Sequence, residues 1–382
     1  MIMGSESIGY HSYNPAWENL LLKHLKLILF SSNTVTLANI LNGKSEPKSS
    51  TLIKFAEAFN ININALLEDS PKLNTLRFRT PKSLSGRKKA EREQIRFDTA
   101  IWLKNYRFLE DSLNEKTEYE FAALNEENPE IAAMKIRKTF RSWDNKQPVY
   151  DIANIIEDAG IKLKIHGFGF KKTNGLSVGS QNEGPAIVVN SESGISVERQ
   201  IFTIAHELGH LILHSGSYKD PKEIEDKKEE HEANLFAGAF LLPEGGLQEE
   251  WEESKGLHWV NAVLRIKKIY KVSYKTVLVR LCQIKNQDPS SVFKDFAIAY
   301  KKLHNHDLKN FYEPDQLEEP VAPSDPDSLA KSDLIEDRFA RLVRQAYENE
   351  LISLSRAGEM LNLSLLDMRD RAKAWQENPI DA

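Results

Sequence analysis

The chain has 382 residues, a net charge of -5 at pH 7, 41% hydrophobic residues and 28% charged residues. This length exceeds one ordinary hydrophobic core and predicts two or three domains, and the composition excludes a fibrous or wholly disordered chain. Since the net charge is slightly acidic, DNA binding would need a local basic patch. The single cysteine, Cys282, excludes an intrachain disulfide and a cysteine-rich metal site.

The N-terminal and apolar segments indicate a cytoplasmic protein. Residues 1–17 lack the basic stretch followed by an apolar one that a signal peptide needs. The longest apolar runs, such as Leu235–Leu242, are too short to span a bilayer. We therefore expect no membrane partner.

Composition divides the chain into five predicted segments. Residues 15–70 have the pattern of a small helical domain, and residues 71–130 form a basic linker and helical connector. Residues 131–310 alternate helical and strand-like patterns and form the largest domain. An acidic, proline-rich linker at 311–331 precedes a helical tail at 332–382. We interpret this tail as an accessory or dimerisation element, which would make the protein a homodimer.

The N-terminal segment carries a turn signal between two helical patterns. Thr34–Gly43 ends in Asn-Gly and is followed by Pro47 and the apolar helix Leu52–Phe59. This pattern resembles the second half of an Xre-type helix-turn-helix domain, in which the first of these helices lies in the major groove. A preceding polar-x-x-Leu-Ala helix is not recognisable in Lys23–Ser32, so a helical bundle that docks protein or has lost DNA binding is the alternative. The resemblance implies base contacts from Asn33, Thr34, Thr36 and Asn39, and phosphate contacts from Lys44 and Lys48.

Two strands and a helix are predicted in the middle of the chain. Ile161–Ile165 alternates apolar and polar residues, as a half-buried strand does. Ala186–Asn190 is a β-branched run that ends at a turn-like stretch and predicts a second strand. Ser196 is a suitable N-cap for the apolar helix that follows, and Glu198 in its first turn complements the helix dipole.

The apolar helix contains the HExxH motif His206-Glu207-Leu208-Gly209-His210. Residues four apart share a helix face, so both imidazoles can bind one ion. Glu207 is poorly placed to be a ligand but close enough to act as a general base. Bound zinc lowers the pKa of water from about 15.7 to about 7 and polarises a scissile carbonyl. Catalytic zinc normally has three protein ligands, so the motif predicts a third.

The third ligand is expected on the next helix, Glu229–Leu242. The long zinc motif HExxHxxGxxH is excluded, because its Gly and final His positions hold Leu213 and Gly216. His214 lies outside that spacing and is interpreted as a polar residue near the helix end. We favour Glu230, because Asn234 then lies on the same helix face and can orient a ligating imidazole. Glu232 is the runner-up, and a candidate that does not bind the metal is predicted to be a solvated helix residue. The candidate ligands on this helix are Glu229, Glu230 and Glu232.

Together these motifs resemble the ImmA/IrrE family of zinc metallopeptidases. The strongest matches are Phe202–His214, Glu230–Ala237 and Leu241–Pro243, and the similarity covers roughly Ala132–Pro243. Further matches precede the motif helix, at residues 148–160, 175–178 and 187–190. The family usually has methionine before the final proline, where this chain has Leu242, a conservative difference.

The resemblance implies an α+β fold: a gluzincin-like zinc peptidase domain, with a small all-α helix-turn-helix domain before it and a helical tail after it. It leaves the group that stabilises the oxyanion open, and His231 and Tyr218 are candidates that also suit an ordinary surface position. In this type of peptidase the substrate lies along an edge strand. Ala186–Asn190 is thus a candidate binding strand, or alternatively an interior core strand.

Two functions from different classes follow. The first is a zinc-dependent endopeptidase with a DNA-binding-like module, which cleaves a repressor or other regulatory protein in a phage, toxin-antitoxin or stress response. The alternative is a DNA-binding regulator or antitoxin whose peptidase domain is a sensor or scaffold without turnover. The expected partners are a protein substrate and double-stranded DNA. A His/His/Glu set favours zinc but also suits manganese or iron.

Overall fold

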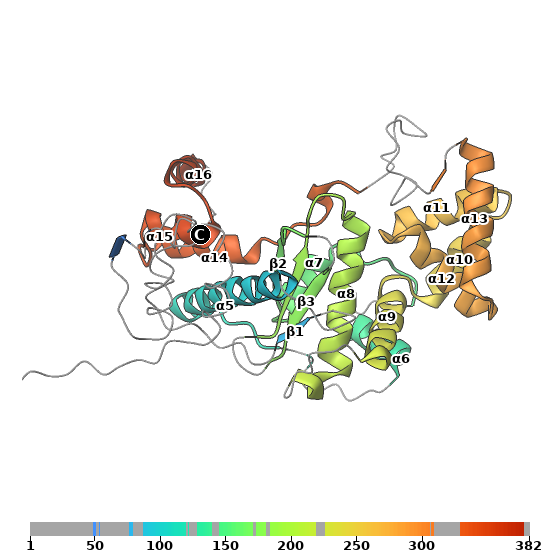
Figure 1. The fold of residues 1–382 in the computed structure, drawn as a ribbon, viewed down its shortest axis with the longest axis horizontal. Coiled ribbons are helices and arrows are strands. Elements are labelled where there is room, and N and C mark those ends of the chain that lie inside the picture. Colours follow the sequence, from blue (N-terminus) through green and yellow to red (C-terminus); the bar gives the residue numbers. More distant parts are fainter. Residues whose placement is uncertain are drawn as a thin grey trace, which may run out of the picture. The chain divides into compact units, whose positions relative to one another are not determined.

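The computed structural model divides the chain into two compact units (Figure 1). One comprises residues 1–72, 84–106 and 352–382, and the other comprises residues 73–83 and 107–351. The residues that the structure describes are 87–119, 121, 128–139, 145–170, 173–180, 184–218, 226–305, 307–308 and 329–377, with 49, 50, 53 and 76–78. The predicted DNA contacts Asn33, Thr34, Thr36, Asn39, Lys44 and Lys48 lie outside them, so their role stays a prediction.

The second unit contains a four-stranded sheet in the order β1-β3-β4-β2. Its strands are β1 (Leu76–Phe78), β2 (Lys162–His166), β3 (Gly175–Val178) and β4 (Ala186–Asn190). β4 pairs in parallel with β2 and antiparallel with β3, whose other edge pairs antiparallel with β1. The two predicted strands are confirmed, and the first begins one residue later than expected.

The expectation that Ala186–Asn190 is an edge strand is wrong. β4 lies between β3 and β2, and all five of its residues are buried. A continuous β-branched run is typical of a strand that is covered on both faces. The interior alternative is therefore correct, and the edges of the sheet belong to β1 and β2.

The motif helix α8 (Val197–Leu213) packs against β3, β4 and the following helix α9 (Lys227–Leu241). Ser196 caps α8 as predicted, because its side chain accepts a hydrogen bond from the backbone N–H of Arg199. α9 begins two residues before its predicted start, since Asp226 accepts the Lys228 backbone N–H and forms a better cap. α6 (Pro129–Thr139) packs against α9 and also contacts α8, and α7 (Ile152–Asp158) precedes β2.

Further helices extend the second unit beyond α9. They are α10 (Glu244–Glu253), α11 (Trp259–Tyr270), α12 (Tyr274–Lys285), α13 (Pro289–His304) and α14 (Arg338–Glu348), with short 3-10 turns at Ser215–Tyr218 and Lys331–Asp333. Side chains of α8, α9 and α11 to α13 share one hydrophobic core with the sheet.

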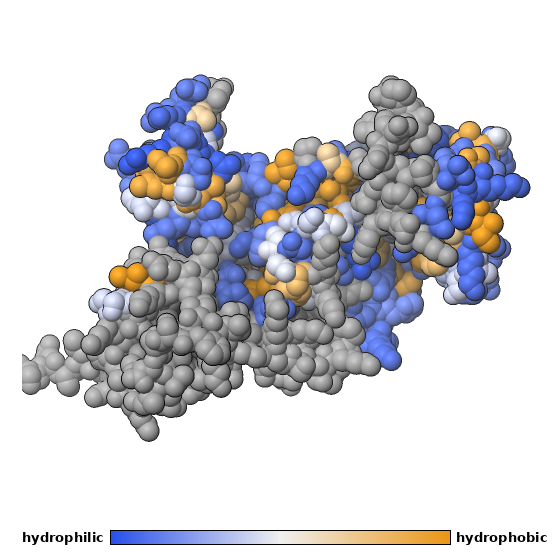
Figure 2. All heavy atoms as spheres, turned by 45° about the horizontal axis from the view of Figure 1, so that its top comes forward, coloured by the Kyte–Doolittle hydropathy of each residue, from blue (hydrophilic) through white to orange (hydrophobic). Residues whose placement is uncertain are grey.

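In the first unit, α15 (Leu354–Leu361) packs against α16 (Leu365–Glu377), and α5 (Arg87–Leu113) runs from this unit into the other. On the face in Figure 2, hydrophobic residues of the described parts occur in small groups among polar ones. Such scattered exposure is ordinary for a protein surface. No helix among the described residues combines the length and apolarity needed to cross a membrane.

Candidate metal and catalytic site

Two helices bring three metal-binding side chains together. His206 and His210 lie one turn apart on α8, are both buried, and have their Nε2 atoms 3.0 Å apart. From α9, the two carboxylate oxygens of Glu230 lie 3.4 Å from the Nε2 of His206 and 3.2 Å from the Nε2 of His210. One ligand atom from each residue can be chosen so that all three lie within 4.8 Å of one another.

The spacing of these donors fits a tetrahedral ion. Ligand atoms at about 2.0–2.1 Å from zinc, arranged tetrahedrally, are about 3.3 Å apart. The two Nε2 atoms are 3.0 Å apart, and they lie 3.4 and 3.2 Å from different oxygens of Glu230, all close to that value. Two imidazoles and one carboxylate also match the donor types that zinc prefers in catalytic sites. The three side chains are therefore suited in geometry and chemistry to hold one divalent cation.

The Nδ1 atoms of His206 and His210 each lie within hydrogen-bonding distance of another side chain. The Oδ1 of Asn234 lies 3.0 Å from the Nδ1 of His206, and the Nδ1 of His214 lies 2.9 Å from the Nδ1 of His210. The Oε2 of Glu232 lies 2.9 Å from the Nε2 of His214. Partners of this kind fix the tautomer and orientation of a ligating imidazole, so each Nε2 is left directed at the common site.

The expectations for His214 and Glu232 hold only in part. His214 lies at the end of α8 as predicted, but it is buried, and Glu232 is partly buried against it rather than solvated. The physical reason is that His206, His210 and His214 repeat every four residues, so the third imidazole follows the other two along one helix face. The four-residue spacing could have indicated the position of His214 from the sequence, whereas the contact of His214 with Glu232 on α9 could not have been predicted.

The electrostatics of Glu230 favour its charged form. Burial alone would raise the pKa of its carboxyl, but hydrogen bonds and positive charge from His206 and His210 outweigh burial. The net effect places the pKa well below its ordinary range. A carboxylate that stays ionised is the form that binds a cation.

Glu207 lies beside the three ligands and is held by the sheet. It is buried, and its Oε2 accepts a hydrogen bond of 2.6 Å from the hydroxyl of Ser177 on β3. The Ser177 oxygen is also 2.8 Å from the hydroxyl of Tyr218. Tyr218 is thus buried and linked to Glu207 through Ser177, whereas His231 is exposed on α9. Sequence reasoning missed Ser177, whose signal was a hydroxyl within a short apolar strand.

A glycine allows β3 to approach α8 closely. A Cβ atom on Gly175 would lie 2.5 Å from the Cγ2 of Thr203 and 3.6 Å from the Cγ of Glu207. The first of these distances is shorter than real carbon contacts allow. The absence of a side chain at this position therefore lets the β3 backbone pass directly beside the turn of α8 that carries Glu207.

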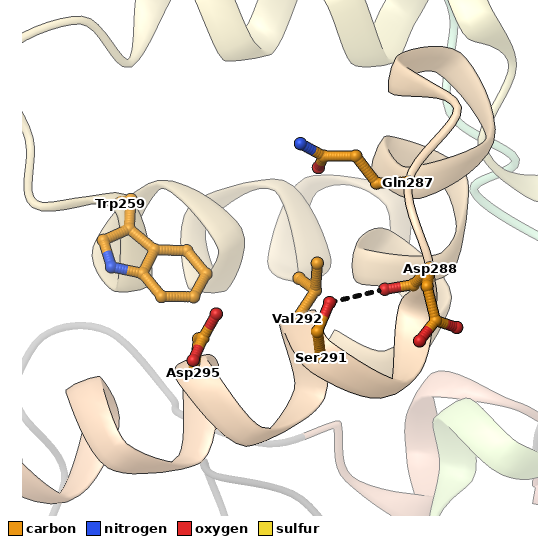
Figure 3. Close-up of a pocket in the computed structure, with 6 residues that line it drawn as sticks. All are labelled: Trp259, Gln287, Asp288, Ser291, Val292 and Asp295. Atoms are coloured by element: carbon orange, nitrogen blue, oxygen red, sulfur yellow. Dashed lines mark hydrogen bonds between the residues drawn. The ribbon is translucent and has the colours of Figure 1, made fainter.

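A hollow of about 390 Å³ lies elsewhere in the second unit (Figure 3). Its lining contains none of the candidate site residues, and Asp288 has a structural role there: its side chain caps α13 and its backbone oxygen accepts the Ser291 hydroxyl. This hollow is not part of the candidate site. It is lined by Trp259, Gln287, Asp288, Ser291, Val292 and Asp295.

The His/His/Glu cluster beside a mixed sheet has the residue types of a metallopeptidase-like site. Residues 156–282 match the family model Peptidase_M78, the IrrE N-terminal-like domain. The match runs from within α7 into α12 and includes every residue of the candidate site, in agreement with the resemblance to the ImmA/IrrE family. It covers 127 residues (282 − 156 + 1) of 382, so it supports a peptidase domain in this part of the chain. No curated protein matches the chain.

Proposed function

We propose that this protein is a zinc-dependent endopeptidase whose ligands are His206, His210 and Glu230 and whose general base is Glu207. The observation that carries the proposal is the set of donor separations of 3.0, 3.2 and 3.4 Å beside a buried glutamate. Peptide hydrolysis needs a polarised carbonyl, an activated water and a proton donor for the leaving amine.

The residues divide this work. A zinc ion bound by the three ligands supplies Lewis acidity, which acidifies water and polarises a peptide carbonyl. Glu207 accepts a proton as the water oxygen bonds to the carbonyl carbon. It then delivers that proton to the amide nitrogen as the C–N bond breaks, so the carboxylate is regenerated. Ser177 donates a hydrogen bond to one oxygen of Glu207 and thereby positions the carboxylate for this proton transfer.

We further propose that the substrate is a repressor or another regulatory protein, and that the N-terminal segment supplies an Xre-like module. The support for both is the sequence resemblance alone. In this proposal Asn33, Thr34, Thr36 and Asn39 contact bases of double-stranded DNA, and Lys44 and Lys48 contact phosphates.

Metal content and repressor cleavage, measured on the same samples, test the proposal. The substrates are repressors encoded beside the gene, and the variants are Glu207→Gln, Glu230→Gln and Glu229→Gln. Glu229 lies next to Glu230 on α9 but bonds the hydroxyl of Ser217, so it is a matched control.

We expect about one zinc per wild-type chain. Glu207→Gln should retain metal and lose cleavage, Glu230→Gln should lose both, and Glu229→Gln should lose neither. Wild-type protein that holds no stoichiometric metal would contradict the proposed site. Zinc binding without cleavage of any neighbouring repressor would contradict the proposed enzyme and favour a regulator without turnover.

A further inference from the structure

β3 is the strand that contacts the proposed catalytic base. Its residue Ser177 bonds Glu207 at 2.6 Å, and its residue Gly175 lies against the same turn of α8. An extended peptide that pairs with β3 would therefore run close to Glu207. Peptides commonly bind sheet edges in this way, because the backbone hydrogen bonds of the edge strand are unsatisfied.

One edge of β3 is closed by β4, and the other edge is closed by β1. The pairing of β1 with β3 is antiparallel, with Leu76 opposite Val178 and Phe78 opposite Leu176. Arg77 is in register with Ser177, the residue that bonds the base. Without β1, β3 would be the edge strand of a three-stranded sheet.

β1 belongs to a different part of the chain from its partners. β3 and β4 lie inside the segment 156–282 that matches the peptidase family, whereas residues 76–78 lie well before it, in the basic linker predicted at 71–130. The linker segment 73–83 nevertheless belongs to the same compact unit as the candidate site. The linker thus adds a strand to the peptidase sheet beside the base.

We propose that the β1-facing edge of β3 is the binding site for an extended peptide substrate, and that Leu76–Phe78 occupies it as an internal competitor. A substrate must displace β1 before it can pair with β3. This inference rests on the proposed peptidase function for its substrate, but the occupancy itself can be measured without any cleavage.

The test weakens β1 in the full chain and measures binding of a labelled synthetic peptide of residues 73–83. The variant Leu76→Pro with Phe78→Pro fixes φ at two of the three strand residues and removes their backbone N–H groups, so it disfavours a paired strand. Its matched control, Leu76→Val with Phe78→Tyr, keeps both N–H groups and two strand-forming residues. A Glu207→Gln background prevents cleavage of the peptide during the titration, and metal content reports that the site has folded.

We expect the proline variant to bind the peptide at least about tenfold more tightly than the control, because the weakened β1 no longer competes with the peptide for the backbone of β3. With Glu207 intact, the same variant should cleave a peptide substrate with a lower KM, and the added peptide 73–83 should inhibit competitively. If the proline variant fails to fold, Leu76→Gly with Phe78→Gly weakens the strand without introducing a proline ring. This glycine variant should likewise bind the peptide more tightly than the control.

Equal peptide binding by the folded variant and its control would overturn the inference, whatever the activity. If binding tightens but neither protein cleaves any substrate, the internal competitor stands and the proposed peptidase function fails. If the control cleaves substrate and weakening β1 changes neither binding nor KM, the peptidase stands and the competitor is refuted.

Discussion

His214→Ala tests whether His214 and Glu232, the pair that contacts His210 through the His214 ring, support metal binding. The substitution removes the 2.9 Å contact between the Nδ1 atoms of His210 and His214, and it also deprives Glu232 of its imidazole partner. His210 keeps its Nε2 beside Glu230 but loses the group that orients its ring. Loss of such a partner typically weakens metal affinity by about 10–100-fold, which corresponds to about 1.4–2.7 kcal/mol.

The assay is a competitive zinc titration against a chelating dye, performed on wild type, His214→Ala, Glu232→Ala and the double variant. If Glu232 acts on the metal only through His214, the double variant should bind zinc no more weakly than His214→Ala alone. Glu229→Ala is the control, since its carboxylate accepts a hydrogen bond from Ser217 and Glu229 is not one of the proposed ligands.

Thermal unfolding of the metal-free proteins separates loss of fold from loss of orientation. The reasoning is refuted if folded His214→Ala binds zinc within about threefold of wild type, because a partner that orients the ring should contribute at least tenfold. It is also refuted if Glu229→Ala weakens zinc binding as much as His214→Ala does.

Three further predictions concern buried polar groups. Burial raises the pKa of Glu157 from 4.5 to about 7, against the opposing effect of the Arg338 backbone N–H. The protonated carboxyl of Glu157 therefore contributes fully to stability below pH 4.5, and this contribution is lost as the pH rises to about 7. In urea titrations the unfolding free energy should fall by up to about 3 kcal/mol over that range. Glu157→Gln should flatten this dependence of stability on pH. Lys267→Met should lower the unfolding free energy by about 3–5 kcal/mol, because it leaves the buried carboxylate of Glu198 without the Lys267 ammonium at 2.8 Å. A loss below about 1 kcal/mol would contradict this prediction, as would a double variant with Glu198→Gln that recovers no stability. Ser177→Ala should lower kcat for peptide cleavage about tenfold with zinc content unchanged, because Glu207 loses a hydrogen bond; an unchanged kcat would mean that Ser177 does not position the base.

The grouping of the candidate ligands could be predicted from the sequence because their relations are local to a helix. His206 and His210 share a face at a spacing of four, and the same spacing led from Asn234 to Glu230. The structure brings these four residues together as that reasoning expects. Helix starts were predictable to within two residues, since Ser196 and Asp226 are ordinary capping residues.

The supports behind the ligands could not be predicted in the same way. Ser177 reaches Glu207 only because β3 packs on α8, and Glu232 meets His214 only through the packing of α8 on α9. The order of the strands is likewise a property of the assembled sheet, so a β-branched run such as Ala186–Asn190 suits an edge or an interior position equally. β1 has only three residues, which is too short for a period of two to be recognised.

The proposed metal ligands and the proposed internal competitor lie on separate parts of the chain. The ligands and their supports, from Ser177 to Asn234, all lie on elements of the matched segment, and most of them are buried there. The proposed competitor lies in the linker and pairs with the edge of β3. Weakening β1 should therefore change the affinity for peptide and leave the affinity for zinc unaltered, whereas His214→Ala should change the affinity for zinc first. If both variants changed both affinities equally, the site would respond as one cooperative unit, and substrate access could not be separated from the metal geometry.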